Sequence, residues 1–261
     1  MTNRAIANYL ARNAFKELCP RAVLFDMDGV LYDSMPYHAV AWQRSMAHFG
    51  LTMTAADAYA SEGARGIDTV SNLARRQRGE QISAEEAQKM YDLKSKLFHE
   101  MAPPPPVMPG ITSLMAQIHR CGLSIGIVTG SGQRPLIARL LADFGQYVTK
   151  GHIVTAYDVD RGKPAPDPYL MGMEKLGGLK PWQAIVVENA PLGVAAGVAA
   201  RCFTIAVNTG PLPDDALTGQ GADIIFSRMT ELDDGWAALY GAMTHHRQMQ
   251  PGRQSSQASS S

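Results

Sequence analysis

Two aspartates, Asp26 and Asp28, end a short apolar run in the segment VLFDMDG at residues 23–29. Alternation along a strand directs both carboxylates to one side, and Gly29 indicates that the chain is already turning. Open parallel sheets bind their ligands at the carboxyl ends of their strands. Buried carboxylates are costly there unless a metal ion or a reacting group lies between them. A strand followed by an acidic, helix-capping turn is the purely structural alternative.

Two later segments offer groups that suit phosphate chemistry. The segment VTGSG combines the hydroxyl of Thr129 with backbone amides around Gly130 and Ser131, and such groups suit phosphate oxygens. The segment GKPAPDP holds Lys163 in a stiff loop, where its cation can neutralise a carboxylate nucleophile and a transferring phosphoryl group. An ordinary strand-to-helix turn and a surface lysine are the alternatives.

A last segment, VENAPLG at residues 187–193, places Glu188 and Asn189 directly after an apolar run. Together with Asp26, their side-chain oxygens could complete a shell of hard ligands for a cation. A helix is expected to begin beside them, so Asn189 as a simple helix N-cap is the competing explanation. Taken together, the four segments favour phosphate chemistry over the structural alternative that each one allows.

Most of these groups follow an apolar run, so a sheet must position them. Apolar runs predict strands at residues 21–26, 123–128, 153–154, 184–187, 203–207 and 222–226. Helical patterns begin near residue 134 and recur at 168–176 and 191–200. Repeated strand–helix units with apolar strands predict an α/β fold with a doubly wound parallel sheet, covered on both faces.

A helical block interrupts this series. The segment 36–101 is helical in pattern, without a strand pattern, and four prolines follow at 103–106. The prolines form either a hinge that closes off an inserted domain or a simple loop. We therefore expect a core domain at 21–35 and 104–244, with a helical cap domain inserted at 36–103.

The composition limits the classes of partner. The chain has 261 residues, 46% of them hydrophobic, a formal net charge of zero and three cysteines without a CxxC pair. A neutral chain without a dense basic block argues against nucleic acid or an anionic membrane as the main partner. Scattered cysteines predict a reduced, cytoplasmic protein, and no apolar run reaches membrane-spanning length. We expect a monomer or a weak homodimer.

The two ends lie outside the predicted domains. Residues 1–20 do not form a signal peptide, because residues such as Arg4 and Arg12 interrupt any apolar core. Ile6 and Tyr9 fit one apolar face, which predicts an extra helix packed on the core rather than a partner-binding arm. The polar stretch 245–261 predicts a disordered tail.

In order, placement and residue types, the four segments resemble those of the haloacid dehalogenase-like (HAD) phosphohydrolases. The helical insert resembles the small four-helix cap of that superfamily. The resemblance implies a Rossmann-like core in which Asp26 attacks phosphorus and forms an aspartyl-phosphate. It implies that Asp28 protonates the leaving group and then activates water, that Thr129 holds phosphate oxygens and that Lys163 balances charge. The Mg²⁺ ligands that it implies are Asp26, the Asp28 backbone carbonyl, Glu188 and Asn189.

Within the HAD proteins, the hinge and the first cap helix are most similar to the β-phosphoglucomutase branch. This resemblance implies that His38 orients Asp28 when the cap closes, and a polar residue near the hinge is the alternative. The final metal-site pair of the mutases is Glu-Asp, whereas here Asn189 follows Glu188. A neutral side chain is a weaker magnesium ligand, so the chain departs from the mutases at this point.

The cap loop SEGARG, residues 61–66, is a second departure. Glu62 stands where the mutases have lysine, and Gly66 stands where they have arginine. A cap acid would repel a phosphorylated sugar and attract a metal ion, so Glu62 is either a metal ligand in the closed cap or a solvated loop acid. Arg65 contacts either the substrate or the surface. This combination is similar to a HAD branch that contains an inorganic pyrophosphatase.

The residues and the resemblance together predict a Mg²⁺-dependent phosphohydrolase that acts on a small phosphorylated compound. A metal held by both domains leaves a small closed cavity, so we expect pyrophosphate first and a small sugar phosphate second. Lys94 and Lys96 on the last cap helix could reach the leaving phosphate. Two alternatives stay open, namely a β-phosphoglucomutase-type phosphotransferase and a non-catalytic HAD-fold protein that binds a partner.

Overall fold

The computed structural model describes residues 2–101, 104–131 and 134–248. Within them, parallel strands form one six-stranded sheet in the order β3-β2-β1-β4-β5-β6. The strands are β1 (Ala22–Phe25), β2 (Ser124–Val128), β3 (Ile153–Val154), β4 (Ala184–Glu188), β5 (Phe203–Val207) and β6 (Ile224–Phe226). The strands predicted from apolar runs are confirmed, and so is the doubly wound α/β fold.

Strand β1 lies between β2 and β4, with Leu24 opposite Gly126 on one side and Val186 on the other. Every residue of β1 and β4 is buried, because helices cover both faces of the sheet. The carboxyl ends of parallel strands lie at one edge, and the chain order reverses at β1. The residues that follow β1, β2 and β4 are therefore brought together at the place where open sheets bind ligands.

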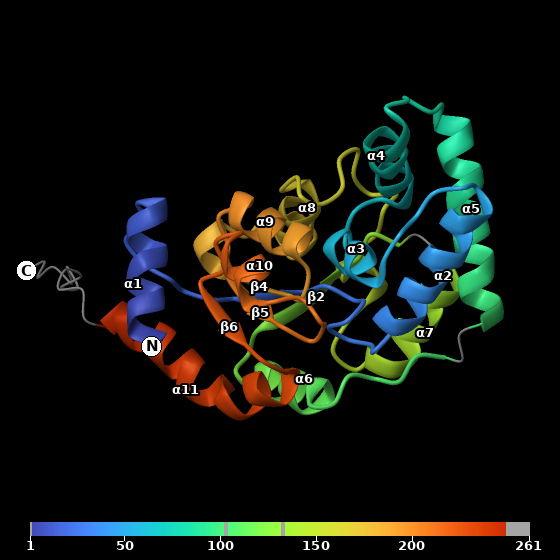
Figure 1. Cartoon of the computed structure of the whole chain (residues 1–261). Coiled ribbons are helices and arrows are strands. Elements are labelled where there is room, and N and C mark those ends of the chain that lie inside the picture. The colour runs from blue at the N-terminus through green and yellow to red at the C-terminus, as the bar shows by residue number, and fades with distance from the viewer. Residues whose placement is uncertain (1, 102–103, 132–133, 249–261) are drawn as a thin grey trace, which may run out of the picture.

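Two groups of helices cover the sheet (Figure 1). One face carries α1 (Thr2–Asn13), α6 (Ile111–Arg120), α7 (Arg134–Phe144) and α11 (Met229–Gln248). The other face carries α8 (Asp167–Lys175), α9 (Pro191–Ala199) and α10 (Asp214–Thr218). Phe25 packs in the first layer and Leu24 in the second, because successive strand residues point to opposite faces.

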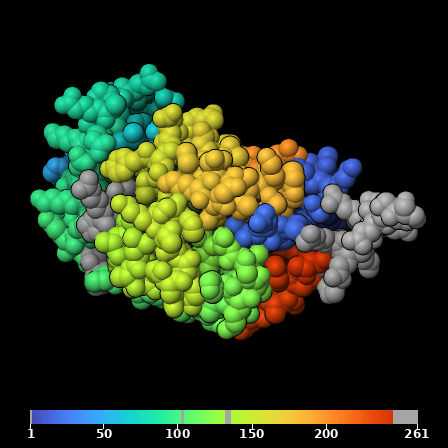
Figure 2. Space-filling view, turned by 180° about the vertical axis from the view of Figure 1, so that it is seen from behind, coloured from blue at the N-terminus to red at the C-terminus, as the bar shows by residue number. Residues whose placement is uncertain are grey.

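The helical block has an apolar core of its own. It contains α2 (Met35–His48), α3 (Ala55–Ala60), α4 (Gly66–Arg78) and α5 (Ala84–Met101). Trp42, Met46, Val70 and Met90 belong to the cluster that these helices enclose. Figures 1 and 2 show the block at the end of the molecule opposite α1. A domain has its own hydrophobic core. We therefore propose that this block acts as a cap. Its division from the sheet domain stays a prediction.

Two adjacent chain segments join this block to the core. The amide of Asp33 donates to the Pro106 carbonyl at 2.9 Å, and the amide of Met108 donates to the Leu31 carbonyl at 2.8 Å. The prolines at 104–106 therefore run beside the segment that leads into α2. A pair of linkers that lie together is where a rotation of the cap would be absorbed.

The helix expected at the start of the chain is α1, and it packs on the core. Ile6 and Tyr9 are fully buried, and the Tyr9 hydroxyl donates to the carbonyl of Arg201 at 3.0 Å. The helix ends at Asn13 rather than near residue 20, because Ala14 adopts a left-handed conformation with φ 55°. The N-terminal segment is thus a short helix followed by an irregular stretch.

Helix α11 continues beyond residue 245 to Gln248, so the disorder predicted for 245–248 is wrong. The remainder of the predicted tail lies outside the described residues. Histidine, arginine and glutamine are acceptable helix residues, which is why their polarity does not end α11. Among the described helices, none is long and apolar enough to cross a membrane.

Candidate active site

Asp26 directly follows β1 and is buried beside a lysine. Lys163 Nζ lies 2.5 Å from Asp26 Oδ1, 2.6 Å from Glu188 Oε1 and 3.2 Å from the carbonyl oxygen of Val128. Burial by itself lowers the pKa of Lys163, but the carboxylates of Asp26 and Glu188 outweigh burial and raise that pKa. Lys163 is therefore a fixed cation between two buried acids.

Both carboxylate oxygens of Glu188, the last residue of β4, have partners. Oε1 accepts from Lys163 and from the Tyr169 hydroxyl at 2.6 Å, and Oε2 accepts from the backbone amide of Asn189 at 3.1 Å. In the described part of the chain, no three acidic, histidine or cysteine side chains are grouped to hold a metal ion. The metal role of Glu188 stays a prediction, and its observed partners are Lys163, Tyr169 and the Asn189 amide.

Two buried oxygens at this edge, Asp26 Oδ2 and Asn189 Oδ1, have no hydrogen-bond partner among the described residues. Asn189 packs closely on the turn after β1, since a Cβ on Gly29 would lie 2.0 Å from Asn189 Nδ2. Gly29 also has a left-handed φ of 82°, which suits glycine. Unpaired buried oxygens call for a donor or a cation, and Mg²⁺ takes oxygen ligands. This donor pair therefore fits Mg²⁺.

Asp28 is held by two residues at the start of the cap. Its Oδ1 accepts from Ser34 Oγ at 2.5 Å and lies 3.2 Å from His38 Nε2. Lys94 Nζ lies 2.7 Å from His38 Nδ1, and the imidazole stacks on Phe98 with 4.0 Å between ring centroids. Because an ammonium only donates, Nδ1 accepts and Nε2 carries the hydrogen that points to Asp28. His38 therefore contacts Asp28 directly, and its orienting role stays a prediction.

The pKa values of this group follow from burial and close neighbours. Burial works to raise the pKa of Asp28, but His38 and Ser34 lower it overall. Burial and Lys94 lower the pKa of His38, so its imidazole is neutral at neutral pH. Burial also lowers the pKa of Lys94 to about 8, although Glu62 works against that change.

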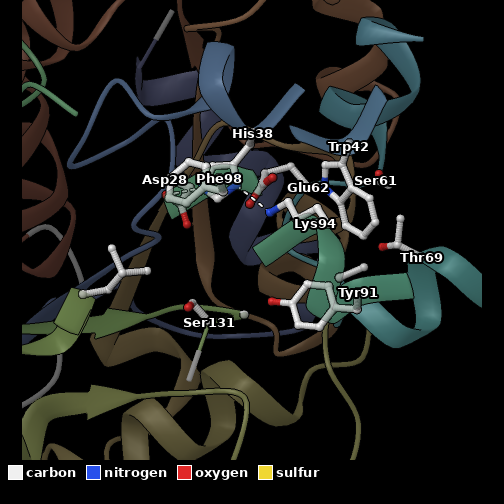
Figure 3. Close-up of a pocket in the computed structure, with 14 residues that line it drawn as sticks. Asp28, His38, Trp42, Ser61, Glu62, Thr69, Tyr91, Lys94, Phe98 and Ser131 are labelled. Atoms are coloured by element: carbon white, nitrogen blue, oxygen red, sulfur yellow. Dashed lines mark hydrogen bonds and ion pairs between the residues drawn. The ribbon is translucent and has the colours of Figure 1, made fainter. Parts of the chain in front are cut away.

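A cavity of about 40 Å³ lies between Asp28 and the cap, as Figure 3 shows. The core contributes Asp28 and Ser131 to its wall, and the cap contributes Glu62, Tyr91 and Lys94. Glu62 and Lys94 point from the cap toward Asp28 in Figure 3. Burial, with the charge of Asp28 adding to it, raises the pKa of Glu62 to about 8. The cap loop thus brings Glu62 to the wall of the cavity, where the residue is half-buried.

Tyr91 closes the side of the cavity that faces Gly66. A Cβ on Gly66 would lie 2.0 Å from Tyr91 Cε2, so the ring occupies the space that any side chain at position 66 would need. Tyr91 was not predicted from the sequence, because α5 gives no local sign of a contact across 25 positions. The place where the mutases carry arginine is filled here by an aromatic ring.

The turn after β2 lies on the core side of the same cavity. The amide of Ser131 donates to Thr129 Oγ1 at 3.0 Å, and both Gly130 and Ser131 line the cavity. A Cβ on Gly130 would lie 3.1 Å from the carbonyl oxygen of Gly63, so the cap loop packs against this turn. The structure therefore brings the predicted phosphate-holding turn next to Asp28 and the cap loop.

The cap lysines separate into two kinds. Lys94 is buried and lines the cavity, whereas the Lys96 side chain is 69% exposed and lies 3.9 Å from Glu100. The expectation that Lys96 reaches the leaving phosphate is therefore wrong in this arrangement. The two residues are two positions apart on α5, and a helix turns them to different faces.

Comparison with known proteins assigns the family. A family model for haloacid dehalogenase-like hydrolases matches residues 20–201. The chain is a haloacid dehalogenase-like hydrolase. The matched range contains the four segments quoted above, so the resemblance drawn from them is confirmed.

Relatives of this HAD-like hydrolase include enzymes of phosphorylated polyols and sugars. Hexitol phosphatase A of Escherichia coli (strain K12) is 32% identical over 215 residues, which cover 81% of this chain and 93% of the relative. β-Phosphoglucomutase of Bacillus subtilis (strain 168) is 27% identical, over 81% of this chain and 94% of the relative. One solved structure is that of a Bacteroides vulgatus protein provisionally described as a β-phosphoglucomutase. It matches with a TM-score of 0.89 and 44% sequence identity, and the match covers 93% of this chain and 98% of that protein.

Proposed function

We propose that this HAD-like hydrolase cleaves a small phosphorylated compound through Asp26, with inorganic pyrophosphate as the first substrate and a small sugar phosphate as the second. The observation that carries the proposal is the cavity of about 40 Å³ that Glu62 and Tyr91 close against Asp28. A cavity needs about 10–15 Å³ to hold one water. The cavity therefore suits a small substrate.

The chain supplies the groups for a two-step phosphoryl transfer. In the first step an oxygen of Asp26 bonds to phosphorus, the bond to the leaving oxygen breaks, and the protonated form of Asp28 gives that oxygen its proton and becomes a carboxylate. In the second step Asp28 takes a proton from water, the water oxygen bonds to phosphorus, and phosphate leaves Asp26. Lys163 lies 2.5 Å from Asp26 and balances charge throughout.

A magnesium ion would be held by Asp26 Oδ2 and Asn189 Oδ1, the two unpartnered buried oxygens of the site within the described residues. The backbone carbonyl of Asp28 and, from the cap, Glu62 are further oxygen donors that we propose. When bound, Mg²⁺ supplies charge neutralisation for the transferring phosphoryl group. The chain's own part is to fix these oxygens, which it does by packing Asn189 on Gly29.

Cap residues would receive the leaving group. The buried ammonium of Lys94 lines the cavity and could pair with a second phosphate. A cation in the cavity would favour the ionised form of Glu62, so Glu62 favours a substrate that arrives with its metal. A pyrophosphate–magnesium complex satisfies both groups, which is why we place pyrophosphate before a sugar phosphate.

A sugar phosphate is the second candidate, because Hexitol phosphatase A and β-phosphoglucomutase are both relatives. A hexose ring would require the cap to open or Tyr91 to move. The phosphotransferase alternative requires a phosphorylated sugar to turn around in the site. The mutase loop has a lysine and an arginine for this, whereas this chain has Glu62 and Gly66 at those positions. The non-catalytic alternative is weakened by the ion-paired Asp26 and Lys163.

Phosphate release with Mg²⁺ tests the proposal across pyrophosphate and a panel of hexose, pentose and triose phosphates, with Asp26→Asn as the control. We expect pyrophosphate to be preferred and the control to be inactive. Phosphate release that is selective for a sugar phosphate would support hydrolysis through Asp26 but contradict the proposed preference for pyrophosphate. Interconversion of glucose 1- and 6-phosphates without phosphate release would replace hydrolysis by the mutase reaction. A metal-loaded protein without any turnover would overturn the proposal.

A further inference from the structure

Arg65 joins the cap to the core by a direct hydrogen bond. Its Nη1 donates to the backbone carbonyl of Asp160 at 2.6 Å. Its Nε and Nη2 donate to the two carboxylate oxygens of Asp68 at 2.7 and 3.1 Å. Asp68 lies in the first turn of α4 and so fixes the guanidinium that reaches across. Arg65 does not line the cavity beside Asp28, but it lines a smaller pocket together with Thr129 and Lys163.

The core loop that accepts this bond is the loop that carries Lys163. A Cβ on Gly162 would lie 2.7 Å from Arg65 Cγ, so the arginine stem packs directly on that glycine. A Cβ on Gly63 would lie 2.9 Å from Lys163 Cδ. The cap loop 61–66 and the core loop 160–163 therefore interlock, with two glycines at the points of closest approach.

We propose that Arg65 is a positioning residue, which latches the cap loop 61–66 onto the loop of Lys163 when the cap closes. Glu62 lies in the same cap loop. The hydrogen bond from Arg65 to the Asp160 carbonyl therefore positions Glu62 and stabilises the loop that carries Lys163. The kinetic part of this inference rests on the proposed function, because it needs a substrate that turns over.

The chemistry of the bond favours arginine over lysine. A guanidinium has donors in a rigid fork, so it holds the Asp68 carboxylate with two of them and still offers another to a carbonyl. The acceptor is a backbone oxygen, which no side-chain change in the core loop removes. The latch therefore depends on the cap side chain and on the small size of Gly162.

The first test compares Arg65→Ala with Arg75→Ala, which removes an exposed arginine of the same cap helix. The closed cap binds substrate, so losing the latch lowers the closed fraction and raises KM in proportion. We expect Arg65→Ala to raise KM by about fivefold to tenfold, which lies within the range of one ordinary hydrogen bond, because this bond is exposed to solvent, and we expect no loss of kcat. Arg75→Ala should keep the wild-type values.

Amide hydrogen exchange provides a readout that does not depend on turnover. We expect faster exchange in Arg65→Ala at 61–66 and 157–162, with unchanged exchange in β1 and β4. Unchanged exchange in both loops would overturn the latch, even if the proposed reaction is correct. Faster exchange in a protein that turns over none of the substrates would uphold the latch and reject the proposed function.

Gly162→Ala is a second variant that reaches the same contact from the core side. Its Cβ would meet Arg65 Cγ, so alone it should raise KM as Arg65→Ala does. Combined with Arg65→Ala it should add no further rise, because the contact is already gone. Additive effects of the two changes would show that they act at separate places and would overturn the proposal.

Discussion

The ammonium of Lys163 lies 2.5 Å from Asp26 Oδ1 and 2.6 Å from Glu188 Oε1, in a place where all three side chains are almost completely buried. One cation thus serves two anions that come from different strands. A buried pair is expensive to break, because removing one partner leaves an uncompensated charge. The same contact therefore matters for folding as well as for the proposed reaction.

Lys163→Met should destabilise the protein and abolish activity. We expect a loss of about 3–5 kcal/mol in the free energy of unfolding, because two buried carboxylates lose their counter-charge. Urea unfolding measures it, with Lys175→Met as control. Lys175 makes a similarly short pair with Asp158 at 2.6 Å, but both side chains are about a quarter exposed. A control loss above about 1 kcal/mol would show that burial is not the deciding factor.

Lys94→Met should reduce activity more than Lys96→Met. Lys94 is the buried cation that reaches His38 Nδ1 at 2.7 Å, whereas Lys96 faces solvent on the same helix. Losing a positioned cation beside a transferring phosphate costs about 10²-fold or more in kcat. Steady-state rates with the preferred substrate give the comparison, and equal losses in the two variants would remove Lys94 from the site.

Glu62→Ala should raise the Mg²⁺ concentration required for half-maximal rate. Glu62 lines the cavity next to Asp28, whereas Glu80 is exposed near the start of the loop between α4 and α5. Loss of a supporting group around a metal lowers affinity by about tenfold to a hundredfold. Magnesium titrations of Glu62→Ala and Glu80→Ala measure the difference. If the magnesium titrations of the two variants superimpose, Glu62 lines the cavity but does not bind the metal.

Much of the fold follows from local patterns, since each strand is an apolar run and the predicted core ligands Asp26, Glu188 and Asn189 lie at strand ends. The short helices α3 and α10 were not predicted, because a few residues carry too little periodicity to separate them from loops. Helix α6 was also missed, although its buried residues Ile111, Leu114, Met115 and Ile118 have helical spacing. Helix α11 was not predicted, and residues 245–248 at its end were assigned to a disordered tail because they are polar. Elements that pack by their sequence pattern are predictable, and their ends are not.

In the site, residue types were predictable and partners were not. The ion pair of Lys163 with Asp26 follows from motif order, but the Tyr169 hydroxyl on Glu188 joins positions 19 apart through β4 and α8. Tyr91 against Gly66 and Arg65 against Asp160 are also contacts between remote segments. Such contacts depend on how the cap packs on the core, and this packing cannot be predicted from any short segment of the sequence.

A stability test is offered by the start of α3, where Asp57 and Thr54 form reciprocal hydrogen bonds. Hydrogen bonds from Thr54 lower the pKa of Asp57, so its contribution is present above the unfolded-state pKa and is lost as pH falls through the folded-state value. Asp57→Asn should cost about 1 kcal/mol at pH 7. Unfolding measured from pH 7 down to about pH 3 should show the difference shrinking. A difference independent of pH would contradict this assignment.

The measurement that tests the central claim most directly is mass spectrometry of the protein quenched during turnover with its preferred substrate. We predict one added phosphoryl group on the peptide that contains Asp26, and its disappearance together with all turnover in Asp26→Asn. Turnover that continues in Asp26→Asn, or a phosphoryl group found on another residue, would contradict the account.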